Sequence, residues 1–159
     1  MSTETRISRS RLIAAAPEEV WRTLAAFDRI SRWAKNVDHA SFTTPATDGV
    51  GATRRVQAGR VTVLETITEW SPPTRLAYSI AGLPRVVGQV SNSWQLEPAA
   101  GGTRATLTSS VDPGPRIAGR IAAAVLACVL ARTSVQLLAG LAGYHDGREA
   151  RRSADDGSA

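Results

Sequence analysis

The sequence predicts a single α+β domain in which a curved antiparallel sheet of seven strands wraps around one long C-terminal helix. Three observations point to this fold class. An extended opening segment runs straight into a helix, six short β-rich runs follow between turn residues, and a long alanine- and leucine-rich segment follows them. A sheet and a helix of that length bury the apolar faces of both when the sheet curls around the helix and short helices close one end.

The opening segment, residues 5–14, has the pattern of a strand and leads into two short helices. Pro17 suits the first turn of a helix, where its missing N–H costs nothing, and two glutamates follow at the positive end of the helix dipole. Asp28 is expected to cap the second helix, which runs to Trp33. The apolar face of the first helix consists of Val20, Trp21, Leu24 and Phe27.

The middle of the chain predicts six further strands, because β-rich runs alternate with turn residues such as Asp48-Gly49 and Ala58-Gly59. The connections are short, so consecutive strands should pair as an antiparallel meander. The predicted strands are His39–Thr44, Ala52–Gln57, Val61–Glu69, Arg75–Ile80, Val87–Leu96 and Arg104–Val111.

The last long segment predicts one helix from Ile117 to His145, about 29 residues or about 43 Å at the standard rise. The sequence Asp112-Pro113-Gly114-Pro115 separates it from the last strand. We expect one domain over residues 1–146 and a flexible polar tail over residues 147–159.

The apolar start of this helix raises the question of a membrane span. Arg120 and Arg132 bracket an uncharged run of about 11 residues, whereas a span needs about 20, so we expect a buried core helix and no transmembrane segment. The helix has two apolar stripes on nearly opposite faces, and a second stripe needs cover of its own. Either a homodimer forms through part of this helix, or the sheet, loops and short helices cover both stripes. The first stripe is Ile117, Ile121, Cys128, Val135 and Ala142, and the second is Leu126, Leu130, Leu137, Leu141 and Tyr144.

The composition is that of an ordinary soluble protein, with 43% hydrophobic and 21% charged residues among 159. The net charge is +5, but the arginines are scattered, whereas a nucleic-acid-binding protein more often clusters them with aromatics, so no nucleic-acid partner is expected. No early apolar signal segment is visible, which predicts a cytoplasmic protein. The single cysteine, Cys128, excludes an internal disulfide and is expected to be a small buried hydrophobe.

The sequence contains no motif for a nucleophile, a phosphate-binding loop or a zinc site, so neither a cofactor nor a metal is expected. The histidines, His39 and His145, are far apart in the chain. His145 is expected at the end of the long helix, where a basic residue suits the helix dipole.

The candidate site lies on the inner face of the sheet. If Ala58-Gly59 is a two-residue hairpin loop, Arg54 lies opposite Val63 and becomes a diagonal neighbour of Glu65 on the face that carries the valines. An inward Arg–Glu pair is either structural, because a buried carboxylate needs such a partner, or a polar anchor in an apolar cavity. A slip of one residue would instead turn Arg55 inward.

Two more strands place polar and aromatic side chains on the inner walls. Tyr78 and Trp94 either pack in the core or line a cavity, and Trp33 is expected at the cavity mouth. Asn92 carries an amide that must find partners in water, backbone or ligand when it is buried. The candidate cavity residues are Trp33, Arg54, Glu65, Tyr78, Asn92 and Trp94.

Four segments carry a family resemblance through most of residues 7–111. They are Ile13–Trp21 with Phe27-Asp28 and Trp33, then Gly49–Val56, then Glu65–Tyr78, and then Trp94–Pro98 with Gly101–Arg104. In this order they resemble the SRPBCC superfamily, which includes START domains, polyketide cyclases and the birch-pollen-allergen group. The resemblance implies the helix-grip fold, in which the sheet and the long helix enclose an apolar cavity.

Because this superfamily is functionally diverse, its fold does not fix a function. We expect binding or transport of a small hydrophobic ligand, such as a lipid, a polyketide or an aromatic metabolite. The alternative is a polyketide cyclase- or dehydratase-like enzyme that uses general acid–base residues in the same cavity. A third reading is an interaction protein whose second helical stripe is the working surface.

Overall fold

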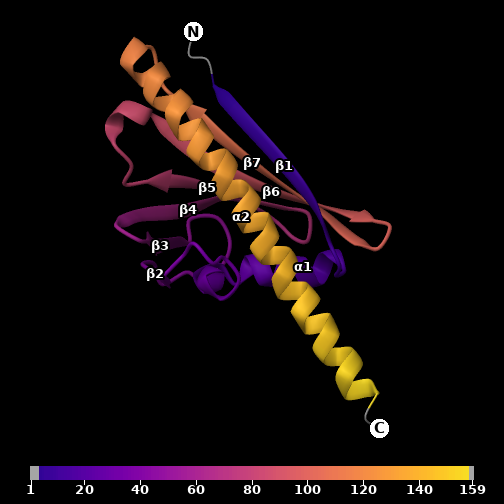
Figure 1. Cartoon of the computed structure of the whole chain (residues 1–159). Helices are drawn as coiled ribbons and strands as arrows, with labels where there is room; N and C mark the ends of the chain where they lie inside the picture. The colour runs from indigo at the N-terminus through magenta and orange to yellow at the C-terminus, as the bar shows by residue number, and fades with distance from the viewer. Residues whose placement is uncertain (1–3, 158–159) are drawn as a thin grey trace.

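The computed structural model describes residues 4–157 and confirms the predicted fold, an antiparallel sheet of seven strands with a long helix lying across it (Figure 1). The strands occur in the order β1-β7-β6-β5-β4-β3-β2, so β1 and β2 form the edges of the sheet. The strands are β1 (Thr5–Ile13), β2 (His39–Phe42), β3 (Thr53–Ala58), β4 (Val61–Ser71), β5 (Arg75–Ala81), β6 (Gln89–Ala99) and β7 (Gly102–Asp112). The helices are α1 (Pro17–Ala25) and α2 (Ile117–Asp156), with the short 3-10 helices η1 (Phe27–Arg32) and η2 (Arg85–Val87).

The link from β1 to α1 packs tightly against the turn between β6 and β7. The hydroxyl of Thr103 donates a hydrogen bond of 2.7 Å to the backbone oxygen of Ala15. Gly102 is required beside it, because a Cβ atom there would collide with the backbone oxygen of Ile13. The expected cap of the second short helix is wrong: η1 begins at Phe27, and Asp28 makes no cap hydrogen bond to it.

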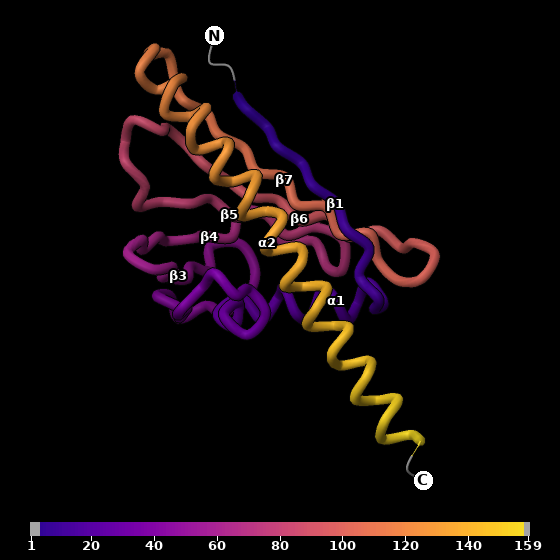
Figure 2. The backbone as a smooth tube through the Cα atoms, viewed as in Figure 1, coloured from indigo at the N-terminus to yellow at the C-terminus, as the bar shows by residue number. Residues whose placement is uncertain are grey.

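Helix α2 continues to Asp156, so its predicted end at His145 is wrong. The segment from Arg148 to Ala154 contains three arginines, two alanines and a glutamate, which favour a helix, and Gly147 before it does not end the helix. Arg152 in this extension also forms an ion pair of 3.0 Å with Glu19 of α1. Figure 2 shows the extension leaving the body of the protein. The division into a domain over residues 1–146 and a flexible tail stays a prediction.

The two apolar stripes of α2 have different surroundings. The leucine stripe faces the sheet, with Leu137 and Leu141 buried. In the other stripe Ile117 and Ile121 are exposed, and Cys128 is exposed as well, so its predicted burial is wrong. Periodicity identified the two stripes, but it did not tell which of them the sheet covers.

By length and composition, α2 contains an 18-residue window apolar enough for a membrane span, with a mean hydropathy of 1.9. Core helices of soluble proteins pass the same test, so one such helix is weak evidence, and the absence of a transmembrane segment stays a prediction. Only 28% of the window is buried. The expectation of a buried core helix therefore holds better for the second half of α2 than for the first half.

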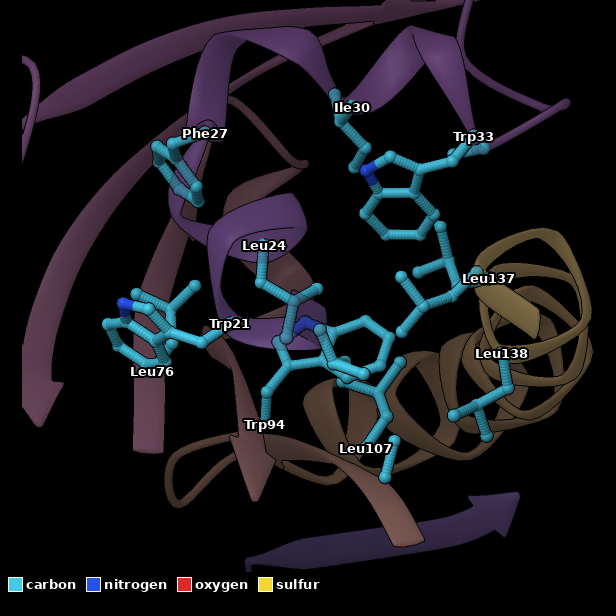
Figure 3. Packing of buried hydrophobic residues seen from close by; sticks show 14 of the residues in the cluster. Trp21, Leu24, Phe27, Ile30, Trp33, Leu76, Trp94, Leu107, Leu137 and Leu138 are labelled. Atoms are coloured by element: carbon cyan, nitrogen blue, oxygen red, sulfur yellow. The ribbon is translucent and has the colours of Figure 1, made fainter. Parts of the chain in front are cut away.

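The main core lies between the inner face of the sheet, the short helices α1 and η1, and the second half of α2 (Figure 3). Three T-shaped aromatic pairs connect these layers. Their ring centroids are separated by 5.1 Å for Trp21 and Trp70, 5.4 Å for Phe27 and Tyr78, and 6.1 Å for Trp33 and Trp94. A smaller cluster under the first half of α2 contains Val87, Val90, Val111 and Ala123.

Candidate functional site

Arg54 and Glu65 lie directly opposite each other on β3 and β4, rather than diagonally as predicted. The hairpin loop is Gly59-Arg60 instead of Ala58-Gly59, since Ala58 pairs with Val61. The register therefore differs by two residues from the predicted one. A shift of two preserves the face of each side chain, so both residues still point inward.

The buried pair joins the sheet to η1. Nε of Arg54 donates to a Glu65 carboxylate oxygen at 2.7 Å, and a second guanidinium nitrogen lies 2.5 Å from the same oxygen. Arg54 also donates to the backbone oxygen of Phe27, and its guanidinium lies 3.6 Å from the centroid of the Phe27 ring. Arg54 is 2% exposed and Glu65 7% exposed. Both charges are thus paired in the interior, which fits the structural reading of this pair.

A row of buried polar side chains crosses three strands and reaches α2. Asn92 donates from its amide nitrogen to the Tyr78 hydroxyl at 3.2 Å, and its amide oxygen accepts from Ser109 at 2.7 Å. The hydroxyls of Ser109 and Ser134 lie 3.5 Å apart. Tyr78, Asn92 and Ser109 are direct register partners on β5, β6 and β7. The buried amide of Asn92 therefore finds its partners within the protein.

Sequence reasoning missed Ser109 and Ser134. Ser109 alternates with Leu107 and Val111 on the inward face of β7, and this period-two pattern was the available signal. Ser134 lies one helical turn before Leu138 on the buried face of α2.

Tyr78 is held in its protonated form. Burial raises the pKa of the Tyr78 phenol, and the negative charge of Glu65 adds to this effect, while Arg54 opposes it. Because its oxygen accepts from Asn92, the Tyr78 proton is directed elsewhere. The site therefore contains a neutral phenol inside an apolar core, which can donate a hydrogen bond.

Trp33 lies at the boundary between the core and the surface. Its ring packs edge to face on Trp94, and its backbone oxygen lies against Gly140 of α2, where a Cβ atom would collide with it. The side chain is buried at 7% exposure, yet its indole N–H has no hydrogen-bond partner among the described residues. Buried donors are nearly always paired, so this one calls for an explanation.

Two surface grooves meet at Trp33. The first, of about 760 Å³, lies between α1, η1 and the second half of α2 with its extension, and the second, of about 630 Å³, lies between η1 and α2. A third groove of about 510 Å³ lies beside η2. The other five candidate residues line none of these grooves and are enclosed in the core; they are Arg54, Glu65, Tyr78, Asn92 and Trp94.

The first groove is basic. Its lining includes two glutamates, of which Glu19 is already paired with Arg152. His145 borders the groove from the middle of α2 rather than from a helix end, which corrects its predicted role as a dipole partner. Burial lowers the pKa of His145 despite the opposing charge of Glu19, so the ring is neutral near pH 7, and its Nε2 lies 3.0 Å from the Thr23 hydroxyl. The five arginines of the lining are Arg22, Arg29, Arg32, Arg148 and Arg152.

No cluster of three or more His, Cys, Asp or Glu side chains within residues 4–157 is placed to hold a metal ion. The side chains described above offer hydrogen bonding, ion pairing and apolar contact. Tyr78 and Asn92 supply these inside the core, and the arginines supply them at the groove.

The geometry defines a protein of the helix-grip class, with its polar candidates enclosed between the sheet and α2. Residues 4–146 match the family described as polyketide cyclase / dehydrase and lipid transport, and the chain belongs to that family.

Comparison with solved structures supports the same fold. The ZhuI aromatase/cyclase from Streptomyces sp. R1128 superposes with a TM-score of 0.75 at 19% identity, covering 92% of this chain and 96% of that one. Ara h 8.0201 superposes with a TM-score of 0.72 at 15% identity, covering 91% of this chain and 99% of that one. The di-domain aromatase/cyclase StfQ from the steffimycin biosynthetic pathway gives 0.74 at 14% identity, covering 92% of this chain and 52% of that one. At these identities the likeness concerns the fold alone.

Among curated proteins, the uncharacterized protein Rv2574 of Mycobacterium tuberculosis is 31% identical over 98 residues. The match covers 60% of this chain and 59% of that protein. An uncharacterized protein of Mycobacterium bovis, Mb2604, matches to the same extent.

Proposed function

We propose that the protein binds a small hydrophobic ligand that carries a polar or anionic group, and that the ligand enters the interior at Trp33. The observation that carries this proposal is the buried indole N–H of Trp33, which has no partner among the described residues. An unpaired buried donor costs about 1–3 kcal/mol. An oxygen atom of a ligand would remove that cost, so the free protein is prepared to accept one.

The surroundings of Trp33 fit such a ligand on both sides. Outward, the arginine-lined groove of about 760 Å³ favours a carboxylate, sulfonate or phosphate. Inward, Trp33 rests on Trp94, and the phenol of Tyr78 and the amide of Asn92 lie in the same core. A mostly apolar space with a few placed polar groups is the usual design of a small-molecule site. Opening the interior requires the Trp33 ring to leave Trp94.

Two measurements test this proposal. Native mass spectrometry of freshly purified protein should detect a bound apolar small molecule. In fluorescence titrations with 1-anilinonaphthalene-8-sulfonate, an aromatic anion, Trp33→Phe should weaken binding about fivefold to tenfold, because it removes the N–H but keeps an aromatic ring.

Trp70→Phe is the matched control, since Trp70 packs on Trp21 and lines none of the three grooves. It should leave the probe affinity unchanged. Equal affinity of Trp33→Phe and the wild type, together with a mass spectrum free of small molecules, would refute the proposal.

A cyclase- or dehydratase-like activity stays the alternative. Tyr78 carries a proton at neutral pH, because burial raises its pKa, so in this alternative it would act by donating a hydrogen bond to the substrate rather than as a strong acid. The Glu65 carboxylate is occupied by Arg54 and is less suited to act as a base. If Tyr78→Phe abolished turnover of a polyketide substrate but kept ligand affinity, the protein would be an enzyme rather than a carrier.

The predicted homodimer also stays open, and sedimentation at high micromolar concentration tests it.

A further inference from the structure

We propose that the first half of α2, together with η2, docks on the surface of an anionic lipid bilayer. The surface concerned, called the docking face here, consists of Ile117, Ile121, Val125 and Val129 with Val86 of η2. This inference does not depend on the ligand proposal, because it concerns the outer side of α2 and no ligand enters its test.

The docking face is a continuous exposed apolar stripe. Ile117, Ile121, Val125 and Val129 follow one another at intervals of four residues and are 75%, 65%, 63% and 53% exposed. Side chains at this spacing lie on one side of a helix. The opposite side of the same turns is buried at Gly119, Ala123 and Ala127.

Val86 extends this stripe at its beginning. It is exposed, and its backbone oxygen lies against Gly119, where a Cβ atom would come within 3.2 Å of it. Isolated exposed apolar residues are common on proteins, whereas a contiguous apolar patch marks an interaction site.

The charges around the docking face indicate which kind of partner surface can bind to it. From Ile117 to His145 the chain contains no aspartate or glutamate. Four exposed arginines lie in or beside the docking face, and none of them forms an ion pair within the part of the chain that the structure describes. They are Arg85, Arg116, Arg120 and Arg132. An apolar stripe bordered by arginines is the pattern of a helix that lies in the interface of a membrane with anionic lipids.

Arg132 argues against a second copy of the chain as the partner. It lies eleven residues after Ile121, about three helical turns, and therefore continues the line of the stripe. In a twofold dimer the same face meets itself, so Arg132 would be buried against a face without carboxylates. At a bilayer its long side chain can instead extend to the lipid phosphates while its methylene groups remain in apolar contact.

The experiment is flotation of the purified full chain with lipid vesicles. We expect the wild type to float with vesicles of phosphatidylcholine containing one quarter phosphatidylglycerol, and to float much less with pure phosphatidylcholine. Raised salt should weaken the binding, because it screens the arginines.

Ile121→Gln/Val125→Gln should lower the apparent affinity for anionic vesicles at least tenfold. Glutamine favours a helix, so the substitutions should leave α2 intact. Val61→Gln/Leu64→Gln, which removes two exposed apolar side chains from β4, is the matched control and should bind as the wild type does. Circular dichroism verifies that each variant is folded. Should the apolar variant fail to fold, Arg120→Gln/Arg132→Gln gives an independent test, with an expected loss of at least fivefold on anionic vesicles.

Absence of wild-type binding to the anionic vesicles would overturn the proposal, and so would unchanged binding by both the apolar and the arginine variant. A stable dimer in sedimentation that Ile121→Gln/Val125→Gln converts to a monomer would assign the face to a second copy instead.

Discussion

Removal of the Glu65 carboxylate tests the internal ion pair most directly. In Glu65→Leu, Arg54 would remain buried against the Phe27 carbonyl oxygen and the rings of Phe27 and Tyr78, with no carboxylate beside it. Breaking a buried pair by removing one partner costs about 3–5 kcal/mol, because the remaining charge is uncompensated. A small domain has a stability of about 5–15 kcal/mol, so we expect this variant to lose a large part of it.

Glu69→Leu is the matched control for this measurement. Glu69 lies on the same strand and also pairs with an arginine, Arg75, at 3.2 Å, but the two side chains are 38% and 50% exposed. An exposed pair contributes about 0–1 kcal/mol. Urea titrations of the wild type and both variants give the free energies of unfolding, and the loss in Glu65→Leu should exceed that in Glu69→Leu by about 2–5 kcal/mol.

The double variant Arg54→Met/Glu65→Leu separates the unpaired charge from the lost packing. Apolar replacement of both partners is often neutral or stabilising, although the Phe27 carbonyl oxygen loses its donor here, at about 1–3 kcal/mol. We therefore expect the double variant to be more stable than Glu65→Leu. Equal losses in Glu65→Leu and Glu69→Leu, or a double variant less stable than Glu65→Leu, would refute the reasoning.

Two further predictions concern His145 and the contact between α2 and Trp33. Because burial lowers the pKa of His145, the unfolded chain binds a proton that the folded protein does not, so stability should fall as the pH drops through about 6.5. Thermal melts should show a shallower fall for His145→Gln than for His39→Gln, and parallel falls would contradict this cause. Gly140→Ala would place a Cβ atom against the Trp33 backbone oxygen and should cost about 1–3 kcal/mol, whereas Gly143→Ala meets nothing within 4 Å and should gain about 0.5–1 kcal/mol. Urea titration distinguishes the two, and equal effects would mean that α2 does not press on Trp33.

Alternation along the strands was enough to find the inner face of the sheet. Arg54, Glu65, Tyr78 and Asn92 are all buried on that face, as their positions predicted. Their hydrogen-bond partners depended on the register, which the sequence left open because Gly59 can serve as either residue of a two-residue loop. Burial of these residues follows from pattern, whereas a role in ligand binding does not, and that role stays a proposal.

The length and the environment of α2 were harder to predict. The segment after His145 looked like a polar tail, because helix propensity is a weak signal when no apolar stripe accompanies it. In the structure Arg152 reaches Glu19 of α1, a contact between residues that are far apart in the chain. The exposure of Cys128 was missed for a related reason, since an apolar stripe in a sequence does not reveal whether anything covers it.

The two ends of η1 are held in different ways, and this difference indicates how the interior can open. At its first residue, the backbone oxygen of Phe27 accepts from Arg54, whose charge is itself fixed by Glu65. Just after its last residue, Trp33 is held by packing on Trp94 and by contact with Gly140, and its indole N–H is unpaired among the described residues. Moving the start of η1 would disrupt a buried ion pair, while rotating the Trp33 side chain breaks no hydrogen bond of its indole. Under the proposed function, a ligand should therefore enter by rotation of the Trp33 side chain over a fixed backbone, and Glu65→Leu should release η1 as well as destabilise the fold.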